Sequence, residues 1–185
     1  MAIPLLIITA LQSELKAAVV SAHAPIVYTG VGKINAALAT YAAIQLYRPK
    51  RVVNFGTAGK INPALSGLVQ IKKVIQRDMM TEPLAPRGTV PFSEGPHVFH
   101  SPEGDYVCGS GDSFVTQSDP WLTGNRIDVV DMELFAIASV AHRHGIDWLA
   151  YKYISDDANH ESGSEWESRV NHGEGLFLEK LKELR

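Results

Sequence analysis

Residues 51–59, RVVNFGTAG, join a short apolar run to a glycine loop. Continuous apolar runs are typical of strands covered on both faces, and glycine lets the chain turn sharply where the strand ends. The same order precedes this stretch, because Ile26–Tyr28 leads into Gly30–Lys33 and apolar side chains then recur at helical spacing over residues 34–41. Strand, glycine loop and helix therefore repeat along the chain, which predicts a parallel sheet.

Elsewhere in the chain, short apolar runs indicate strands, and apolar residues that recur with a period of 3.6 indicate helices. The patterns predict strands at Leu5–Ile8, Leu68–Gln76, Arg126–Val130 and Trp148–Ile154, helices at Gln12–Val20 and Asp131–His144, and a closing helix with Trp166, Val170, Phe177, Leu181 and Leu184 on one face. Residues 164–167, SEWE, have the capping-box pattern, and residues 79–104 are expected to form a long loop. We expect one α/β domain over residues 1–185, three-layered, with a central, mostly parallel twisted sheet and helices on both faces.

Composition limits the possible partners. A chain of 185 residues that is 45% hydrophobic can bury one sizeable core, and a net charge of -3 with interspersed signs provides no basic stripe for nucleic acid. Cys108 is the only cysteine, which excludes an internal disulfide and favours a buried small side chain. The apolar stretch Ile3–Leu11 is too short to cross a bilayer and lacks the basic residues that open a signal peptide. We expect a cytoplasmic, soluble protein with a small-molecule ligand and neither a nucleic-acid nor a membrane partner.

Carboxylates in apolar surroundings mark the candidate site. Glu133 lies in the segment VVDMELFAIA, and Asp156 lies in YISDDA. A charge in such surroundings is costly unless a polar partner uses it. Ligands of parallel sheets bind beyond the carboxyl ends of the strands, where Glu14, the loop Gly56–Gly59, Glu133 and Asp156 are all expected. Their convergence predicts one site.

Each carboxylate also has an interpretation without a ligand. An acid near the start of a helix, as expected for Glu133 and Glu14, is stabilised by the helix dipole by about 0.3–1 kcal/mol. Asp156 fits a solvated turn with an Asx hydrogen bond. With a ligand present, a charged Glu133 could accept two hydroxyl protons from a ribose diol, and partial burial of Asp156 would suit a general acid.

Several short motifs, in this order, resemble those of a known family. GTAG at 56–59 is similar to its T-G-S-A-G loop, SGDSF at 110–114 to its S-G-D-x-F segment, and DMELFAIA and ISD to its E-M-E-A-x-A-I-A and I-S-D segments. They resemble the nucleoside phosphorylase and nucleosidase superfamily, most closely the 5′-methylthioadenosine/S-adenosylhomocysteine nucleosidases. The sequence departs from the pattern at Asp131, Lys60 and Asp157, and it is shorter in the 79–104 region that would shape the 5′ pocket.

The resemblance implies hydrolysis of the N-glycosidic bond of a purine (adenine) nucleoside, such as 5′-methylthioadenosine or S-adenosylhomocysteine, with release of the free base through an oxocarbenium-like state. It assigns Asp156 to protonating the departing adenine, Glu14 to deprotonating water and Glu133 to holding the ribose diol. Phe114 would stack on the purine. The other substrate-binding residues that it implies are Thr57, Ala58, Gly59, Val115, Met132 and Ser155.

Cofactors and subunits are also constrained. No cofactor or metal is expected, because the pairs His97/His100 and His142/His144 lack a matching cluster of ligands. The resemblance implies a homodimer in which neighbouring subunits complete the pocket.

Other functions stay open at this point. A phosphorylase must hold a phosphate dianion, usually with several arginines. Arg48 and Arg51 flank the start of a strand, at the end of the sheet remote from the proposed site, which leaves Lys33, Lys72 and Arg77 as candidate cations. Futalosine or another 5′-modified nucleoside could be the substrate. A non-catalytic nucleoside-binding module would keep the glycine loops and Phe114 and use the carboxylates only to anchor ribose.

Overall fold

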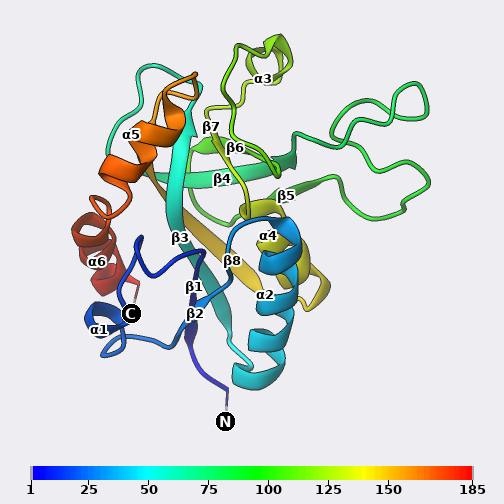
Figure 1. The fold of residues 1–185 in the computed structure, drawn as a ribbon. Helices are drawn as coiled ribbons and strands as arrows, with labels where there is room; N and C mark the ends of the chain where they lie inside the picture. The colour runs from blue at the N-terminus through cyan, green and yellow to red at the C-terminus, as the bar shows by residue number, and fades with distance from the viewer. Residues whose placement is uncertain (1, 185) are drawn as a thin grey trace.

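Strands β3 (Arg51–Lys60) and β8 (Asp147–Asp156) run in parallel through the middle of the molecule (Figure 1). The computed structural model describes residues 2–184. The other strands are β1 (Leu5–Thr9), β2 (Ile26–Tyr28), β4 (Leu68–Gln76), β5 (Val98–His100), β6 (Tyr106–Ser110) and β7 (Val129–Asp131). The helices are α1 (Ala17–Val20), α2 (Lys33–Tyr47), α3 (Pro120–Gly124), α4 (Leu134–Arg143), α5 (Ser162–Arg169) and α6 (Glu174–Glu183).

The sheet is mixed, so the prediction of a mostly parallel sheet was wrong. Strands β2, β1, β3 and β8 are parallel, as are β4, β6 and β7, but β3 pairs antiparallel with β7, and β4 pairs antiparallel with β8 and β5. Strands β3, β7, β6, β4 and β8 therefore pair in a closed ring. No helix separates β3 from β4, and a parallel crossover needs about a dozen residues or more, so the short 61–67 connection reverses the chain.

The glycine stretch 56–59 differs from its prediction as a loop. It continues β3, and its residues pair with β8 as far as Gly59, which lies opposite Asp156. The register shifts between Ala58 and Gly59, which marks a β-bulge at the end of the strand. The glycine stretch 56–59 and the segment that ends at Asp156 were expected near each other, and they lie on the adjacent strands β3 and β8.

Helices pack against both faces of the central strands. On one face, α2 and α4 contribute to a core with alternate residues of β1, β3 and β8, including Leu6, Val52 and Ala150. On the other face, Phe177 of α6 stacks on Phe55, with ring centroids 4.5 Å apart. This alternation along each strand buries both faces and leaves the strand ends to form the site. No helix within residues 2–184 combines the length and apolarity required to cross a membrane.

The helices at the two ends of the chain are shorter than expected. The predicted helix over Gln12–Val20 is only α1, because the backbone N–H of Leu11 bonds the Glu14 carboxylate and holds the preceding residues in turns. The single closing helix is two helices, α5 and α6. Their junction contains Gly173, where a β-carbon would lie 2.5 Å from the Cβ of Tyr153. The capping-box prediction was also wrong, because α5 begins after Glu161.

Candidate active site

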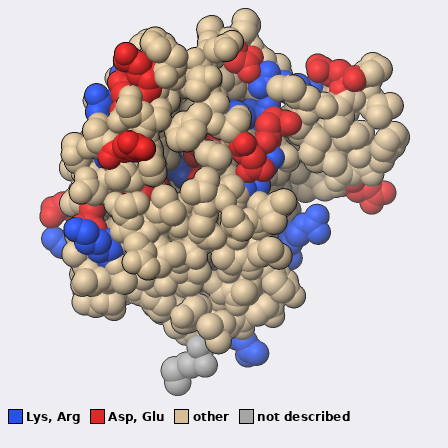
Figure 2. All heavy atoms as spheres, viewed as in Figure 1, with Lys and Arg blue, Asp and Glu red and all other residues tan. Residues whose placement is uncertain are grey.

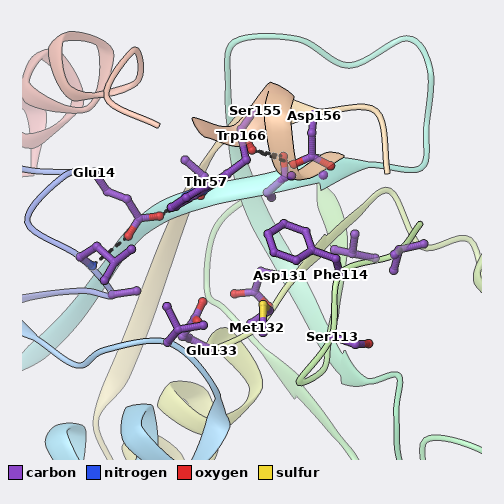
Figure 3. A pocket seen from close by; sticks show the side chains of 18 of the residues that line it. Glu14, Thr57, Ser113, Phe114, Asp131, Met132, Glu133, Ser155, Asp156 and Trp166 are labelled. Atoms are coloured by element: carbon purple, nitrogen blue, oxygen red, sulfur yellow. Dashed lines mark hydrogen bonds between the residues drawn. The ribbon is translucent and has the colours of Figure 1, made fainter. Parts of the chain in front are cut away.

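A cavity of about 340 Å³ lies at the carboxyl ends of β1, β3 and β8 (Figure 3). Every residue that the sequence nominated lines it: Glu14, Thr57, Ala58, Gly59, Phe114, Val115, Met132, Glu133, Ser155 and Asp156. On this face of the molecule acidic and basic side chains are interspersed, without an extended area of one sign (Figure 2). The geometry therefore suits a small ligand held by local polar contacts.

Glu14 is fixed by four hydrogen-bond donors. Its Oε1 accepts from the backbone N–H and the hydroxyl of Thr57, both at 2.8 Å, and its Oε2 accepts from Leu11 N–H at 3.1 Å and the Thr9 hydroxyl at 3.3 Å. Only 4% of Glu14 is exposed. A carboxylate has about four acceptor positions, so these donors hold its orientation against the cavity.

Glu133 is the N-cap of α4 rather than a residue of its first turn. Its Oε1 accepts a hydrogen bond of 2.9 Å from the N–H of Gly32, in the loop before α2. Gly32 has φ of 94°, a left-handed conformation that favours glycine. Burial, and then the negative charge of Asp131, raises the pKa of Glu133 to about 7. The side chain therefore changes charge in the neutral range.

A buried ion pair lies beneath Glu133. Nζ of Lys152 is 2.7 Å from Oδ2 of Asp131, which also accepts from Leu134 N–H, while the Ser110 hydroxyl donates to Oδ1. Burial raises the pKa of Asp131, but the charge and hydrogen bonds of Lys152, Ser110 and Leu134 outweigh it, so the pKa is lowered. The signal for Lys152 was present in the sequence, as a lone lysine in the apolar strand of residues 147–156.

Asp156 ends β8 and is 4% exposed. The Ser155 hydroxyl donates to its Oδ2 at 2.9 Å, and the N–H of Ala158 donates to Oδ1 at 3.0 Å. A β-carbon on Gly59 would lie 2.5 Å from the same Oδ1, so the close approach of β3 requires glycine. Asx-type bonding to Ala158 is therefore present, but within the cavity and not in a solvated turn.

Two residues that depart from the family pattern contact each other. Nζ of Lys60 is 3.0 Å from a carboxylate oxygen of Asp157. Lys60 ends β3 and Asp157 directly follows Asp156, so the ion pair links the two strand ends that form this side of the cavity.

Phe114 lies after β6, and 49% of it is exposed. Its ring faces the space between Asp156 and Met132 (Figure 3). The guanidinium of Arg77 supports this segment by donating to the carbonyls of Gly111 and Ser113. An aromatic ring held this way can stack on a planar ligand.

The cavity lining also includes residues that the sequence did not nominate as site residues, among them Arg77, which supports the Phe114 segment, and Trp166, which makes a polar contact. Trp166 was placed on the core face of a helix, but its indole Nε1–H donates to the Thr57 hydroxyl at 2.9 Å. The available signal was general, since a partly buried tryptophan usually finds an acceptor for its N–H. Across residues 2–184 there is no group of three or more histidine, cysteine or acidic side chains placed to hold a metal ion.

The sequence is similar to one family model and to several nucleosidases of the same name. The model of the phosphorylase superfamily matches residues 16–109 and 92–183. The 5′-methylthioadenosine/S-adenosylhomocysteine nucleosidase of Staphylococcus haemolyticus is 28% identical over 155 residues, covering 71% of this chain and 67% of the relative. The nucleosidase of the same name from Bacillus cytotoxicus is 26% identical over 186 residues, covering 85% and 80%.

Solved structures share the fold. The Helicobacter pylori nucleosidase with 5′-methylthioadenosine in its active site has a TM-score of 0.89 at 18% identity, covering 100% of this chain and 98% of that one. The futalosine hydrolase of Helicobacter pylori has a TM-score of 0.90 at 19% identity, covering 100% and 97%.

Proposed function

The chain belongs to the phosphorylase superfamily, and we propose that it hydrolyses the N-glycosidic bond of an adenine nucleoside carrying a modified 5′ group, such as 5′-methylthioadenosine or S-adenosylhomocysteine. The observation that carries this proposal is the placement of three carboxylates. Glu14, Glu133 and Asp156 come from distant parts of the chain, are 4%, 9% and 4% exposed, and line one cavity. Burying three acids in one place is costly, and Glu133, which accepts a hydrogen bond from Gly32 N–H on Oε1, keeps acceptor positions that a ligand can use.

Each carboxylate takes a different role in the proposed reaction. Glu133 accepts hydrogen bonds from the ribose hydroxyls, and the N–H of Gly32 orients it. As the bond between C1′ and the base breaks, Asp156 gives a proton to the departing adenine. A water molecule attacks C1′ and loses a proton to Glu14, where it displaces the longest of the four bonds, that of 3.3 Å from the Thr9 hydroxyl. The positive charge that develops on the sugar is stabilised by the surrounding carboxylates.

The other cavity residues bind and position the substrate in this proposal. Phe114 stacks on the purine, with Val115 beside it. The backbone of Thr57, Ala58 and Gly59 passes along the ribose and base, and Met132 and Ser155 complete the walls.

Water, not phosphate, is the proposed nucleophile, because the nearby cations already have partners. Lys152 is paired with Asp131, and the two terminal nitrogens of the Arg77 guanidinium donate to Gly111 and Ser113, while its Nε is buried without a partner among residues 2–184 and out of a ligand's reach. Lys33 pairs with Asp78 at 2.6 Å. Arg51 begins β3, six residues before Thr57, which is roughly 20 Å along a strand. A phosphate dianion would need cations that are not committed elsewhere.

A nucleoside panel tests the proposal. Purified protein is incubated with 5′-methylthioadenosine, S-adenosylhomocysteine, futalosine, adenosine and inosine, with and without phosphate, and the free base is measured by reverse-phase chromatography. We expect phosphate-independent release of adenine, reduced by at least 100-fold in Asp156→Asn, on the order of the contribution of general acid catalysis. Release only with phosphate would establish a phosphorylase, release from futalosine alone a futalosine hydrolase, and binding without release a non-catalytic module.

We also propose a homodimer, based on the exposed apolar face of α2. Ile34, Leu38 and Tyr41 are 74%, 66% and 52% exposed and lie at spacings of four and three residues, on one side of the helix. Val31, just before this helix, is both exposed and part of the cavity lining, so a second copy covering α2 would border the site. Sedimentation at micromolar concentration should show a dimer that Leu38→Glu dissociates, while Lys182→Glu on exposed α6 leaves it intact. A monomeric unmodified protein would contradict this.

A further inference from the structure

Trp166 is connected to Glu14 through one hydroxyl group. Its indole Nε1 lies 2.9 Å from Oγ1 of Thr57, and that oxygen lies 2.8 Å from Oε1 of Glu14. The three residues belong to α5, β3 and the turn after β1, so the contact joins segments that are remote in sequence. Figure 3 shows Trp166, Thr57 and Glu14 in this order along one side of the cavity.

The donors and acceptors fix the direction of this chain. An indole N–H only donates, and a threonine hydroxyl has a single proton. Thr57 must therefore accept from Trp166 and give its own proton to the Glu14 carboxylate, which only accepts when ionised. The Thr57 hydroxyl is thus committed to Glu14 and is not free to donate to a ribose or to water.

Helix α5 is itself attached to the segment that contains Asp156. A guanidinium nitrogen of Arg169 donates to the carbonyl of Ser155 at 3.3 Å, and Glu165 accepts from the N–H of Asp157 at 3.0 Å. The same helix therefore contacts the strand end at Asp156 and, through Trp166, the carboxylate of Glu14. Its position determines how these two acids face each other across the cavity.

From this geometry we propose that Trp166 is a positioning residue for the general base Glu14: its N–H holds the Thr57 hydroxyl in the rotamer that donates to Glu14. The inference rests on the proposed hydrolysis for its effect on rate. Removing the N–H frees the hydroxyl to rotate, and the Glu14 carboxylate loses one of its orienting donors. The bound nucleoside keeps its contacts to Glu133 and Phe114, so the chemical step is affected more than binding.

The first test is structural and independent of activity. The protein contains three tryptophans, at positions 121, 148 and 166, whose indole N–H signals can be assigned by NMR in ¹⁵N-labelled protein. Thr57→Val removes the acceptor, and we expect it to shift the Trp166 signal while those of Trp121 and Trp148 stay in place. Thr57→Ser keeps a hydroxyl and should leave all three nearly unchanged. An unmoved Trp166 signal in Thr57→Val would overturn the proposal, whether or not the protein is an enzyme.

The second test measures coupling by kinetics. Trp166→Phe keeps an aromatic side chain but removes the pyrrole part of the indole with its N–H, and we expect kcat to fall roughly three- to tenfold with KM within about twofold, the effect of losing one hydrogen bond. The same change made in Thr57→Val should have little further effect, while in Thr57→Ser it should retain its full effect. Trp121→Phe, which lies outside the cavity, is the matched control, and thermal unfolding checks that each variant folds.

The outcomes separate the two proposals. If the NMR coupling is present but the unmodified protein releases no base, the proposed hydrolysis fails and only the contact stands. If Trp166→Phe lowers kcat equally in the Thr57→Val background, Trp166 acts as a wall of the cavity and not through Thr57, and the positioning role is wrong.

Discussion

Nζ of Lys152 lies 2.7 Å from Oδ2 of Asp131, and the two side chains are 1% and 0% exposed. Both charges are removed from water, so each depends on the other. Burial lowers the pKa of Lys152, but the negative charge of Asp131 outweighs it, so the pKa is raised. The pair is therefore ionised, and its charges act on the pKa of Glu133, which Asp131 raises and Lys152 lowers.

Lys152→Met leaves Asp131 buried without its cation, and we expect the free energy of unfolding to fall by about 3–5 kcal/mol. Asp131→Asn in addition removes the unpaired charge, while its amide oxygen can still accept from Leu134 N–H. The double variant should therefore recover most of the loss. Urea denaturation measures each value; a double variant as unstable as Lys152→Met alone would show that the charge is not the cause.

Stability should depend on pH through Glu133. Its pKa rises from 4.5 to about 7, first because of burial and then because of Asp131. Between these values the folded protein binds more protons than the unfolded chain, so the free energy of unfolding falls as pH rises from 4.5 to 7 and then levels off. The contribution is on the order of 3 kcal/mol.

Glu133→Gln is neutral at every pH and is the matched control. We expect the difference in unfolding free energy between the original protein and this variant to change steeply from pH 4.5 to 7 and little above pH 8. Equal pH slopes for the two proteins would contradict the assignment.

Gly59→Ala should disable the site with little change in fold. The added methyl group would lie 2.5 Å from Oδ1 of Asp156, so the carboxylate must move. A displacement of about 1 Å can cost on the order of 100-fold in rate, and we expect kcat to fall by that order. Gly124→Ala, where no atom lies within 4 Å of the added carbon, should keep full activity. Comparable rates for both variants would mean that Asp156 does not need this position.

Sequence located most of the strands because their signal is local, but it missed β6 and also β5, which lies within residues 79–104 and makes the prediction of one long loop there wrong. The apolar run of residues 68–76 coincides with β4, while β8 continues two residues beyond the predicted end at Ile154, as far as Asp156. Antiparallel pairing of β3 with β7 could not be predicted, because it joins residues about 70 positions apart and depends on the bulge at Gly59. The division of the closing helix has a similar origin, since it depends on the contact of Gly173 with Tyr153.

For the site, too, local signals could be predicted from the sequence and long-range contacts could not. Its acids could be nominated because a charge in an apolar segment is visible in the sequence, and the structure places Glu14, Glu133 and Asp156 around one cavity. The partners of these acids could not be nominated, because Trp166 and Lys152 reach them only through tertiary packing.

The ion pair between Lys60 and Asp157 should matter for rate more than for stability. Both side chains are partly exposed, 24% and 46%, so the pair is expected to contribute less than about 1 kcal/mol to folding. Asp157 nevertheless follows Asp156 directly, and the pair holds the ends of β3 and β8 together at the cavity. Lys60→Ala and Asp157→Ala should each lower kcat several-fold. The double variant should be no worse than either single one, because all three variants remove the same contact.

Exchanging the charges, Lys60→Asp with Asp157→Lys, should restore part of the rate. Additive losses in the double variant would show that the two residues act independently and that their pairing does not position Asp156.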